Sequence, residues 1–110
     1  MAKSQRDKGK RGERLVVDAL RPVFPDAARD LNDVYAKRGI DLIHTGKLAV
    51  QVKHYRNHAP ISKLNEIVPG DGEIPVMVSW PTNRKDGPVV VLSLDDFTRI
   101  LEDVGVAYDE

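Results

Sequence analysis

The chain contains no cysteine, so it can form neither a disulfide framework nor a thiolate zinc site. Aromatic residues make up only 5% of its 110 residues, and no uninterrupted apolar run approaches the length of a membrane span. The basic stretch 1–14 leads into an amphipathic segment rather than a signal-peptide core. These absences predict a soluble, intracellular protein of the cytoplasm that has no membrane partner.

The formal net charge of zero hides an asymmetry between the two halves of the chain. Residues 1–58 contain 13 Lys or Arg and 7 Asp or Glu, a balance of +6, whereas residues 59–110 contain 4 and 10, a balance of −6. Such a separation suits a protein that presents one face to a polyanion, although charged ends that only keep the chain soluble are an alternative. The three histidines, His44, His54 and His58, also lie in the basic half and are not spaced as a zinc-binding set.

The hydrophobic periodicity predicts one α/β or α+β domain, with a central mixed five-stranded sheet flanked by helices. Residues 1–8 lack apolar periodicity and are expected to form a flexible basic arm, so the domain spans residues 9–110. Ser93, three residues before Asp96, is typical of a helix N-cap. Helices are predicted over residues 9–23, 60–68 and from 93 or 94 onwards, and strands over residues 27–33, 40–44, 48–55, 74–80 and 88–94.

Residues 39–53 are the most informative segment. Side chains of a strand alternate between its faces, so Gln51 and Lys53 point the same way, and a hairpin through Gly46 would bring Asp41 alongside them. A carboxylate, an amide oxygen and an ammonium group on one face can hold a divalent cation and stabilise an attacked phosphate. An outward-facing strand-end aspartate and a solvated lysine are the alternatives.

Glu13 supports the same site from the first helix, because it projects into the apolar stripe rather than away from it. A carboxylate facing the core is costly unless a positive group pairs with it. A bound cation or Lys53 would be such a partner. Alternatively, Glu13 favours the helix dipole from the first turn while its side chain bends to water.

Taken together, Glu13, Gly39-Ile40-Asp41 and Gln51-Val52-Lys53 resemble the PD-(D/E)XK nuclease superfamily. The segment from Lys8 to Arg14 resembles archaeal-type Holliday junction resolvases within that superfamily. The resemblance implies a restriction-endonuclease-like fold and a homodimer that cuts four-way DNA junctions by paired nicks with magnesium. It places Glu13, Asp41, Gln51 and the Val52 carbonyl in the metal site and assigns Lys53 to the phosphate or the attacking water. Whether manganese substitutes for magnesium is left open.

Basic side chains around this segment are the expected DNA contacts, since each neutralised phosphate releases counterions. Tyr35 could stack on an unpaired base, but packing over its own loop is the alternative. Trp80 is expected in the core or at the dimer interface. The predicted DNA-binding residues are Lys8, Lys10, Arg11, Arg14, Arg29, Lys37 and Arg38.

The chain departs from the resolvases at Gln51, where they carry glutamate. A neutral amide oxygen can still bind magnesium but supplies less charge. Some restriction-type members of the superfamily also carry glutamine there, so a restriction-like or repair nuclease acting on duplex DNA is an alternative. A nucleic-acid-binding module without catalytic activity is another.

Overall fold

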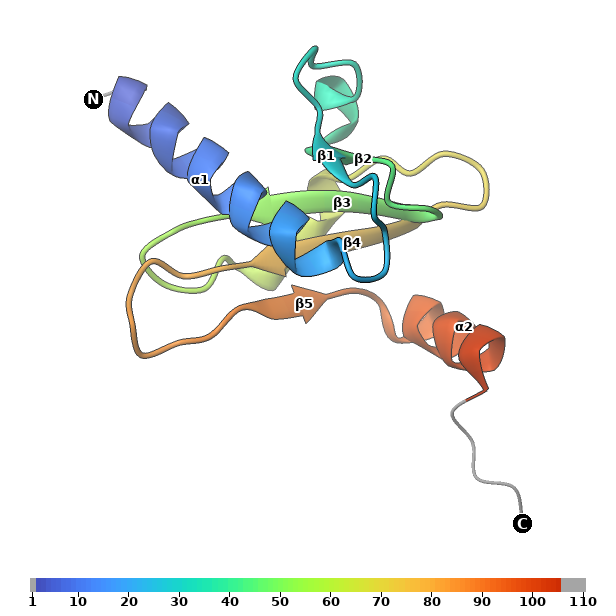
Figure 1. Cartoon of the computed structure of the whole chain (residues 1–110). Coiled ribbons are helices and arrows are strands. Elements are labelled where there is room, and N and C mark those ends of the chain that lie inside the picture. Colours follow the sequence, from blue (N-terminus) through green and yellow to red (C-terminus); the bar gives the residue numbers. More distant parts are fainter. Residues whose placement is uncertain (1, 106–110) are drawn as a thin grey trace.

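The computed structural model describes the backbone of residues 2–105 and the side chains of residues 9–105. It shows a single α/β domain in which an N-terminal helix crosses the strands and a second helix follows the last strand (Figure 1). The elements are α1 (Ala2–Leu20), β1 (Ala28–Arg29), η1 (Ala36–Arg38), β2 (Leu42–Ile43), β3 (Leu48–Lys53), η2 (Ile61–Glu66), β4 (Ile74–Ser79), β5 (Val89–Val91) and α2 (Leu94–Val104).

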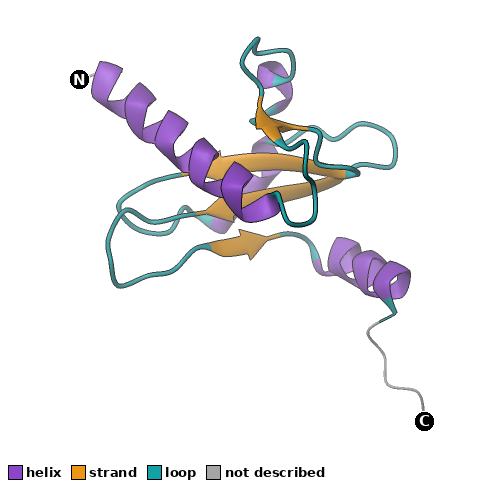
Figure 2. Ribbon diagram, in the orientation of Figure 1, coloured by secondary structure: helices purple, strands orange, loops and turns teal. Residues whose placement is uncertain are grey.

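The strands form two small sheets, so the prediction of one five-stranded sheet was wrong (Figure 2). β1 and β2 pair antiparallel, β3 and β4 pair parallel, and β5 joins β4 antiparallel. β1 and β2 contain two residues each, which leaves too few backbone groups to continue the ladder onto β3. A hydrogen bond of 2.8 Å from the backbone N–H of Asp41 to the carbonyl of Val50 still holds the start of β2 against β3.

α1 packs on one face of β3 and β4 (Figure 1). The helix begins at Ala2 rather than Gly9, so its backbone continues through the segment predicted to be a flexible arm. Side chains alternate along a strand, and the even-numbered positions of β3 and β4 therefore face this helix. The main apolar cluster includes Val16, Val17, Val50, Val76 and Val78.

The opposite face of β3 carries a smaller apolar cluster. Ile40, Ala49 and Ile67 are buried there, and Leu64 of η2 packs against them. Gln51, two residues after Ala49, shares this face and is also buried. The short helix predicted over residues 60–68 is confirmed as η2, which is a 3₁₀ helix, and prolines flank it at positions 60 and 69.

α2 begins as predicted, since the Ser93 hydroxyl accepts a hydrogen bond of 3.1 Å from the backbone N–H of Asp96. Its apolar stripe is only partly covered: Ile100 packs against the main cluster, whereas Phe97 is 44% and Val104 63% exposed. Trp80, which follows β4, also packs against this cluster, as predicted for a core position. In the described part of the chain, no helix combines the length and the apolar character that crossing a membrane requires.

Candidate functional site

Asp41 is held where β2 approaches β3. Its carboxylate Oδ2 accepts a hydrogen bond of 2.7 Å from the backbone N–H of Val52. Its backbone carbonyl accepts a hydrogen bond of 2.9 Å from the backbone N–H of Asp30. The turn before β3 includes Gly46 in the left-handed conformation, at φ 60°. The predicted approach of Asp41 to residues 51–53 is therefore confirmed, although it is made through the backbone of Val52.

The surroundings of Asp41 favour its protonated form. Burial raises the pKa of Asp41 to about 6, and the hydrogen bond from Val52 acts in the opposite direction. The nearby carboxylates of Glu13 and Asp30 also raise this pKa, whereas Lys53 lowers it. A half-buried carboxylate close to other carboxylates is a place where a cation would be stabilised.

Glu13 is paired with Arg29 of β1. The Arg29 Nε–H donates to Glu13 Oε1 at 3.0 Å, and the two side chains are only 19% and 23% exposed, respectively. Sequence reasoning named a cation or Lys53 as the partner of Glu13, and the structure shows this arginine instead. Because α1 and β1 are in contact, the ion pair fixes the carboxylate at the edge of the sheet.

A cleft of about 750 Å³ brings several of the predicted site residues together. Three cationic and four acidic side chains line it, so carboxylates lie beside donors suited to phosphate oxygens. Gln51 and Lys53 are not among its lining residues. The charged residues that line it are Lys10, Glu13, Arg14, Arg29, Asp30, Asp33 and Asp41.

Gln51 and Lys53 meet a residue that sequence reasoning missed. The Gln51 Nε2 donates to Glu66 Oε1 at 3.2 Å, and Lys53 Nζ lies 3.1 Å from the same oxygen. Glu66 ends η2, which packs on the face of β3 opposite to α1. Glu13 and Lys53 therefore come from opposite faces, and Asp41 lies close enough to both for each to shift its pKa. The sequence predicted Asp41, Gln51 and Lys53 on one sheet face, with Glu13 reaching the same site from the first helix. The structure instead places Glu13 and Asp41 in the cleft, and Gln51 and Lys53 against Glu66.

The carboxylate of Glu66 forms ion pairs with two lysines. Hydrogen bonds from Lys63 and then from Lys53 lower the pKa of Glu66 to about 2, so its carboxylate is ionised throughout the physiological range. The only signal in the sequence was an acidic residue three positions after Lys63 in a segment of helical apolar spacing. That pattern is typical of an ordinary surface ion pair, which explains why the residue was not singled out.

The predicted metal ligands fit a divalent cation in part. Among residues 9–105, no three His, Cys, Asp or Glu side chains are grouped closely enough to hold a metal ion. The carboxylates of Glu13 and Asp41 share the cleft, however, and Gln51 Oε1 is a buried oxygen without a hydrogen-bond partner in the described structure. A buried acceptor of this kind calls for an ion or a water. Two carboxylates with an amide oxygen and the Val52 carbonyl are hard oxygen donors of the kind magnesium prefers.

The structure places the predicted DNA-binding residues in different surroundings. Lys10, Arg14 and Arg29 line the cleft, and Arg11 and Lys37 are exposed elsewhere. The side chain of Lys8 lies outside the described residues. Arg38 contacts its own protein on three sides: it pairs with Glu73, donates to the Val68 carbonyl at 2.9 Å and lies 5.5 Å from the centre of the Tyr35 ring. Arg38 and Tyr35 thus support the fold of the loop between β1 and β2.

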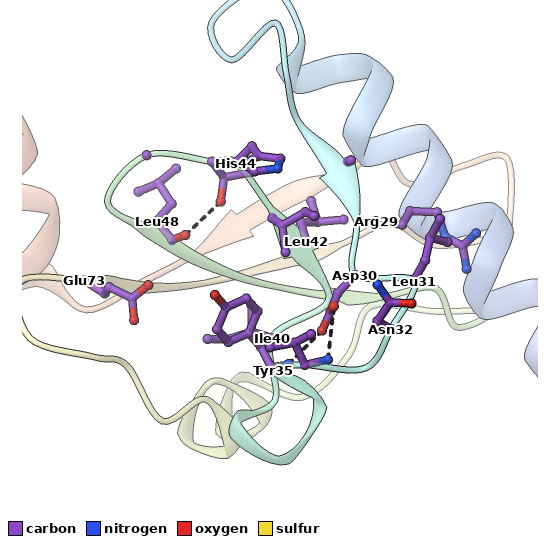
Figure 3. A pocket seen from close by; sticks show the side chains of 15 residues that line it. Arg29, Asp30, Leu31, Asn32, Tyr35, Ile40, Leu42, His44, Leu48 and Glu73 are labelled. Carbon is purple, nitrogen blue, oxygen red and sulfur yellow. Dashed lines mark hydrogen bonds between the residues drawn. The ribbon is translucent and has the colours of Figure 1, made fainter.

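A second cavity, of about 590 Å³, lies between this loop and the β2–β3 turn (Figure 3). The Asp30 carboxylate stabilises the loop by accepting hydrogen bonds from the backbone N–H groups of Val34, at 3.1 Å, and Tyr35, at 2.8 Å. His44 and Glu73 also line the cavity. Aliphatic side chains share its wall with polar ones such as Asn32, His44 and Glu73, and we assign it no chemistry.

Comparison of the chain with protein-family models, with curated proteins and with solved structures finds no match. The resemblance to the PD-(D/E)XK nucleases therefore depends on the residues themselves. Of those residues, Asp41 and Glu13 share the cleft, and Gln51 and Lys53 share Glu66.

Proposed function

We propose that this protein is a magnesium-dependent, structure-selective DNA endonuclease that resolves four-way junctions by paired nicks. The observation that carries the proposal is the cleft that Asp41 and Glu13 line together with Lys10, Arg14 and Arg29. Burial, and then the nearby carboxylates of Glu13 and Asp30, raise the pKa of Asp41, and a divalent cation would stabilise its ionised form. Two active sites are needed to cut two opposed strands, and a homodimer would supply them.

The side chains have separable roles in this proposal. A magnesium ion, when bound, lowers the pKa of a water and neutralises phosphate oxygens. Glu13 and Asp41 would hold the ion from α1 and from the start of β2, with neutral donors from Gln51 and the Val52 carbonyl. Lys53 uses one contact for Glu66, and an ammonium group has further donors with which to orient the attacking water or stabilise the phosphate.

Arg14, Arg29 and Lys10 would position the DNA backbone over the cleft. Arg29 is bound to Glu13 through its Nε–H, so a phosphate held by its guanidinium would lie next to the proposed metal ligands. Phosphate contacts fix the position of a duplex but carry no sequence information. These contacts favour recognition of DNA shape over base sequence.

Two other functions each have an observation in their favour. Gln51 in place of glutamate favours a restriction-like or repair nuclease that cuts linear duplex. The Lys53–Glu66 ion pair, together with the absence of a three-carboxylate cluster within residues 9–105, favours a nucleic-acid-binding module without catalysis.

One experiment distinguishes these functions. The protein is incubated with a synthetic four-way junction and with a linear duplex of the same arms, with and without magnesium. We expect magnesium-dependent paired nicks in the junction and an intact duplex. Cutting of the duplex would support the restriction-like alternative, and retention of both DNAs without products would support the binding module.

A further inference from the structure

On the η2 face of β3, only one end of the Gln51 side-chain amide has a hydrogen-bond partner in the described structure. Gln51 is 4% exposed, and its Nε2 donates to Glu66 Oε1 at 3.2 Å. The reverse orientation of the amide would place two oxygens against each other, so the Glu66 carboxylate fixes which end of the amide it meets. Oε1 is left buried and without a hydrogen-bond partner in the described structure.

The same carboxylate oxygen also contacts Lys53, whose Nζ lies 3.1 Å from it. The second oxygen of Glu66 is 3.0 Å from Lys63, which restrains the carboxylate from the outer side. One glutamate thus orients both β3 side chains that the proposed function requires, at positions 51 and 53. It also supplies, beside position 51, the negative charge that glutamine lacks.

We infer that Glu66 is a positioning residue for the proposed divalent-cation site, holding the Gln51 amide so that its Oε1 is free to bind the cation and holding Lys53 beside it. This inference rests on the proposed function. A buried amide oxygen without a hydrogen-bond partner is destabilising, and a bound cation would supply that partner. Residues that orient metal ligands through hydrogen bonds commonly change metal affinity when they are replaced.

Titration calorimetry of the DNA-free protein with magnesium chloride tests the inference without relying on cleavage. In the Glu66→Gln variant, the new amide can meet Gln51 in either orientation and no longer attracts Lys53. The magnesium dissociation constant is expected to rise on the order of ten-fold. Glu66→Asp keeps the charge on a shorter side chain and should lose less affinity than Glu66→Gln.

The matched control is Lys63→Met, which removes the outer ion pair of Glu66 but leaves its contacts with Gln51 and Lys53. Its magnesium affinity should stay within about two-fold of the wild type, since exposed ion pairs contribute little. The double variant Gln51→Glu/Glu66→Gln exchanges the amide and the carboxylate, and it should recover the affinity lost in Glu66→Gln. Thermal unfolding of every variant verifies that it is folded under the conditions of the titration.

Unchanged magnesium affinity in Glu66→Gln, or no recovery in the double variant, would overturn the positioning role. If the wild type also binds magnesium and cuts the junction, the proposed function survives that result. A wild-type protein that binds no magnesium would overturn the proposed function and this inference together.

Discussion

The two faces of β3 differ in what they bury. The face toward α1 buries Val50 among apolar side chains of α1 and β4, whereas the face toward η2 buries Gln51 close to Ala49. Buried apolar area stabilises a fold by about 25 cal/mol per Å², but a buried polar group is costly unless it is bonded. The α1 face is therefore stabilised mainly by apolar burial, whereas the η2 face combines a smaller apolar cluster with the buried polar residues Gln51 and Ser79.

Asp41 lies where these two faces meet, at the edge where β2 leaves β3. It responds to Glu13 from the α1 side and to Lys53 from the η2 side. The candidate site therefore extends around an edge of the sheet rather than over one of its faces. Residues on the α1 side and on the η2 side can therefore be substituted separately, and the expected effects on DNA cleavage and on the free energy of unfolding differ in size.

The largest effect is expected at the edge itself. In Asp41→Asn, the amide oxygen can still accept from the Val52 N–H, but the charge of the proposed ligand is lost. Junction cleavage should fall at least about 100-fold, since metal-ion catalysis contributes several kcal/mol to lowering the barrier. Single-turnover cleavage and a DNA-binding titration measure the two quantities, and binding should be largely retained. Asp18→Asn, on the exposed side of α1, is the control. Full cutting by Asp41→Asn would remove Asp41 from the site.

The next effect concerns how closely α1 approaches β3. A Cβ atom at Gly12 would lie 2.5 Å from the Cβ of His54, which cannot move away without moving the backbone. Gly12→Ala should therefore lower the free energy of unfolding by about 2–3 kcal/mol, as overpacking does. Denaturant titration measures this loss.

Gly9→Ala is the matched control for Gly12→Ala, because its Cβ would meet nothing within 4 Å. That variant should be stabilised by about 0.5–1 kcal/mol through helix propensity alone. If the two variants behave alike, the close contact of α1 with the end of β3 does not determine stability.

The elements of the fold were more predictable than their pairing. β4 and α2 follow directly from a β-branched run and from a capped apolar stripe. The strand predicted over residues 27–33 shrinks to β1, because the backbone N–H groups of Leu31 and Asp33 bind the carbonyls of Arg29 and Asp30 in local turns rather than a neighbouring strand. Such a choice between local hydrogen bonds depends on the loop that follows, which periodicity does not describe.

The candidate site was predictable only where its contacts are local. The approach of Asp41 to Val52 follows from strand alternation and a turn through Gly46. The partners of Glu13 and Gln51 are Arg29 and Glu66, which are 16 and 15 residues away. Each pairing requires the chain to return along one side of the sheet, and that path is set by tertiary packing rather than by spacing.

The pH dependence of stability provides a smaller effect at Asp41. Because burial raises its pKa from 3.8 to about 6, the folded protein retains this proton at pH values where the unfolded chain has lost it. The resulting stabilisation is complete below about pH 4 and is lost as the pH rises through about 6, a change of about 2 kcal/mol after allowing for partial exposure. Asp41→Asn should therefore be more stable than the wild type near neutral pH.

Unfolding free energies of the two proteins at several pH values test this expectation, and their difference should vanish near about pH 4. Glu66, whose pKa is lowered, contributes the opposite slope at lower pH, but equally in both proteins. Added magnesium should narrow the difference near neutral pH if it binds Asp41. A difference that does not vary with pH would show that the carboxylate of Asp41 is not perturbed by folding.

The smallest effect is expected at Ser79, a buried polar residue on the η2 face whose hydrogen bonds can be removed by substitution. Ser79 is 1% exposed, and its hydroxyl accepts from the backbone N–H of Ala59 at 3.0 Å and contacts His58 Nδ1 at 3.0 Å. Ser79→Ala leaves the Ala59 N–H without that acceptor and should cost about 1 kcal/mol, since water can enter the space left by the hydroxyl. Thr98→Ala, in the exposed part of α2, removes a comparable hydroxyl and should change stability by less than about 0.5 kcal/mol. Equal unfolding free energies for the two variants would mean that the hydrogen bonds of Ser79 do not contribute to stability. The contrast between the two faces of β3 would then depend on Gln51 alone.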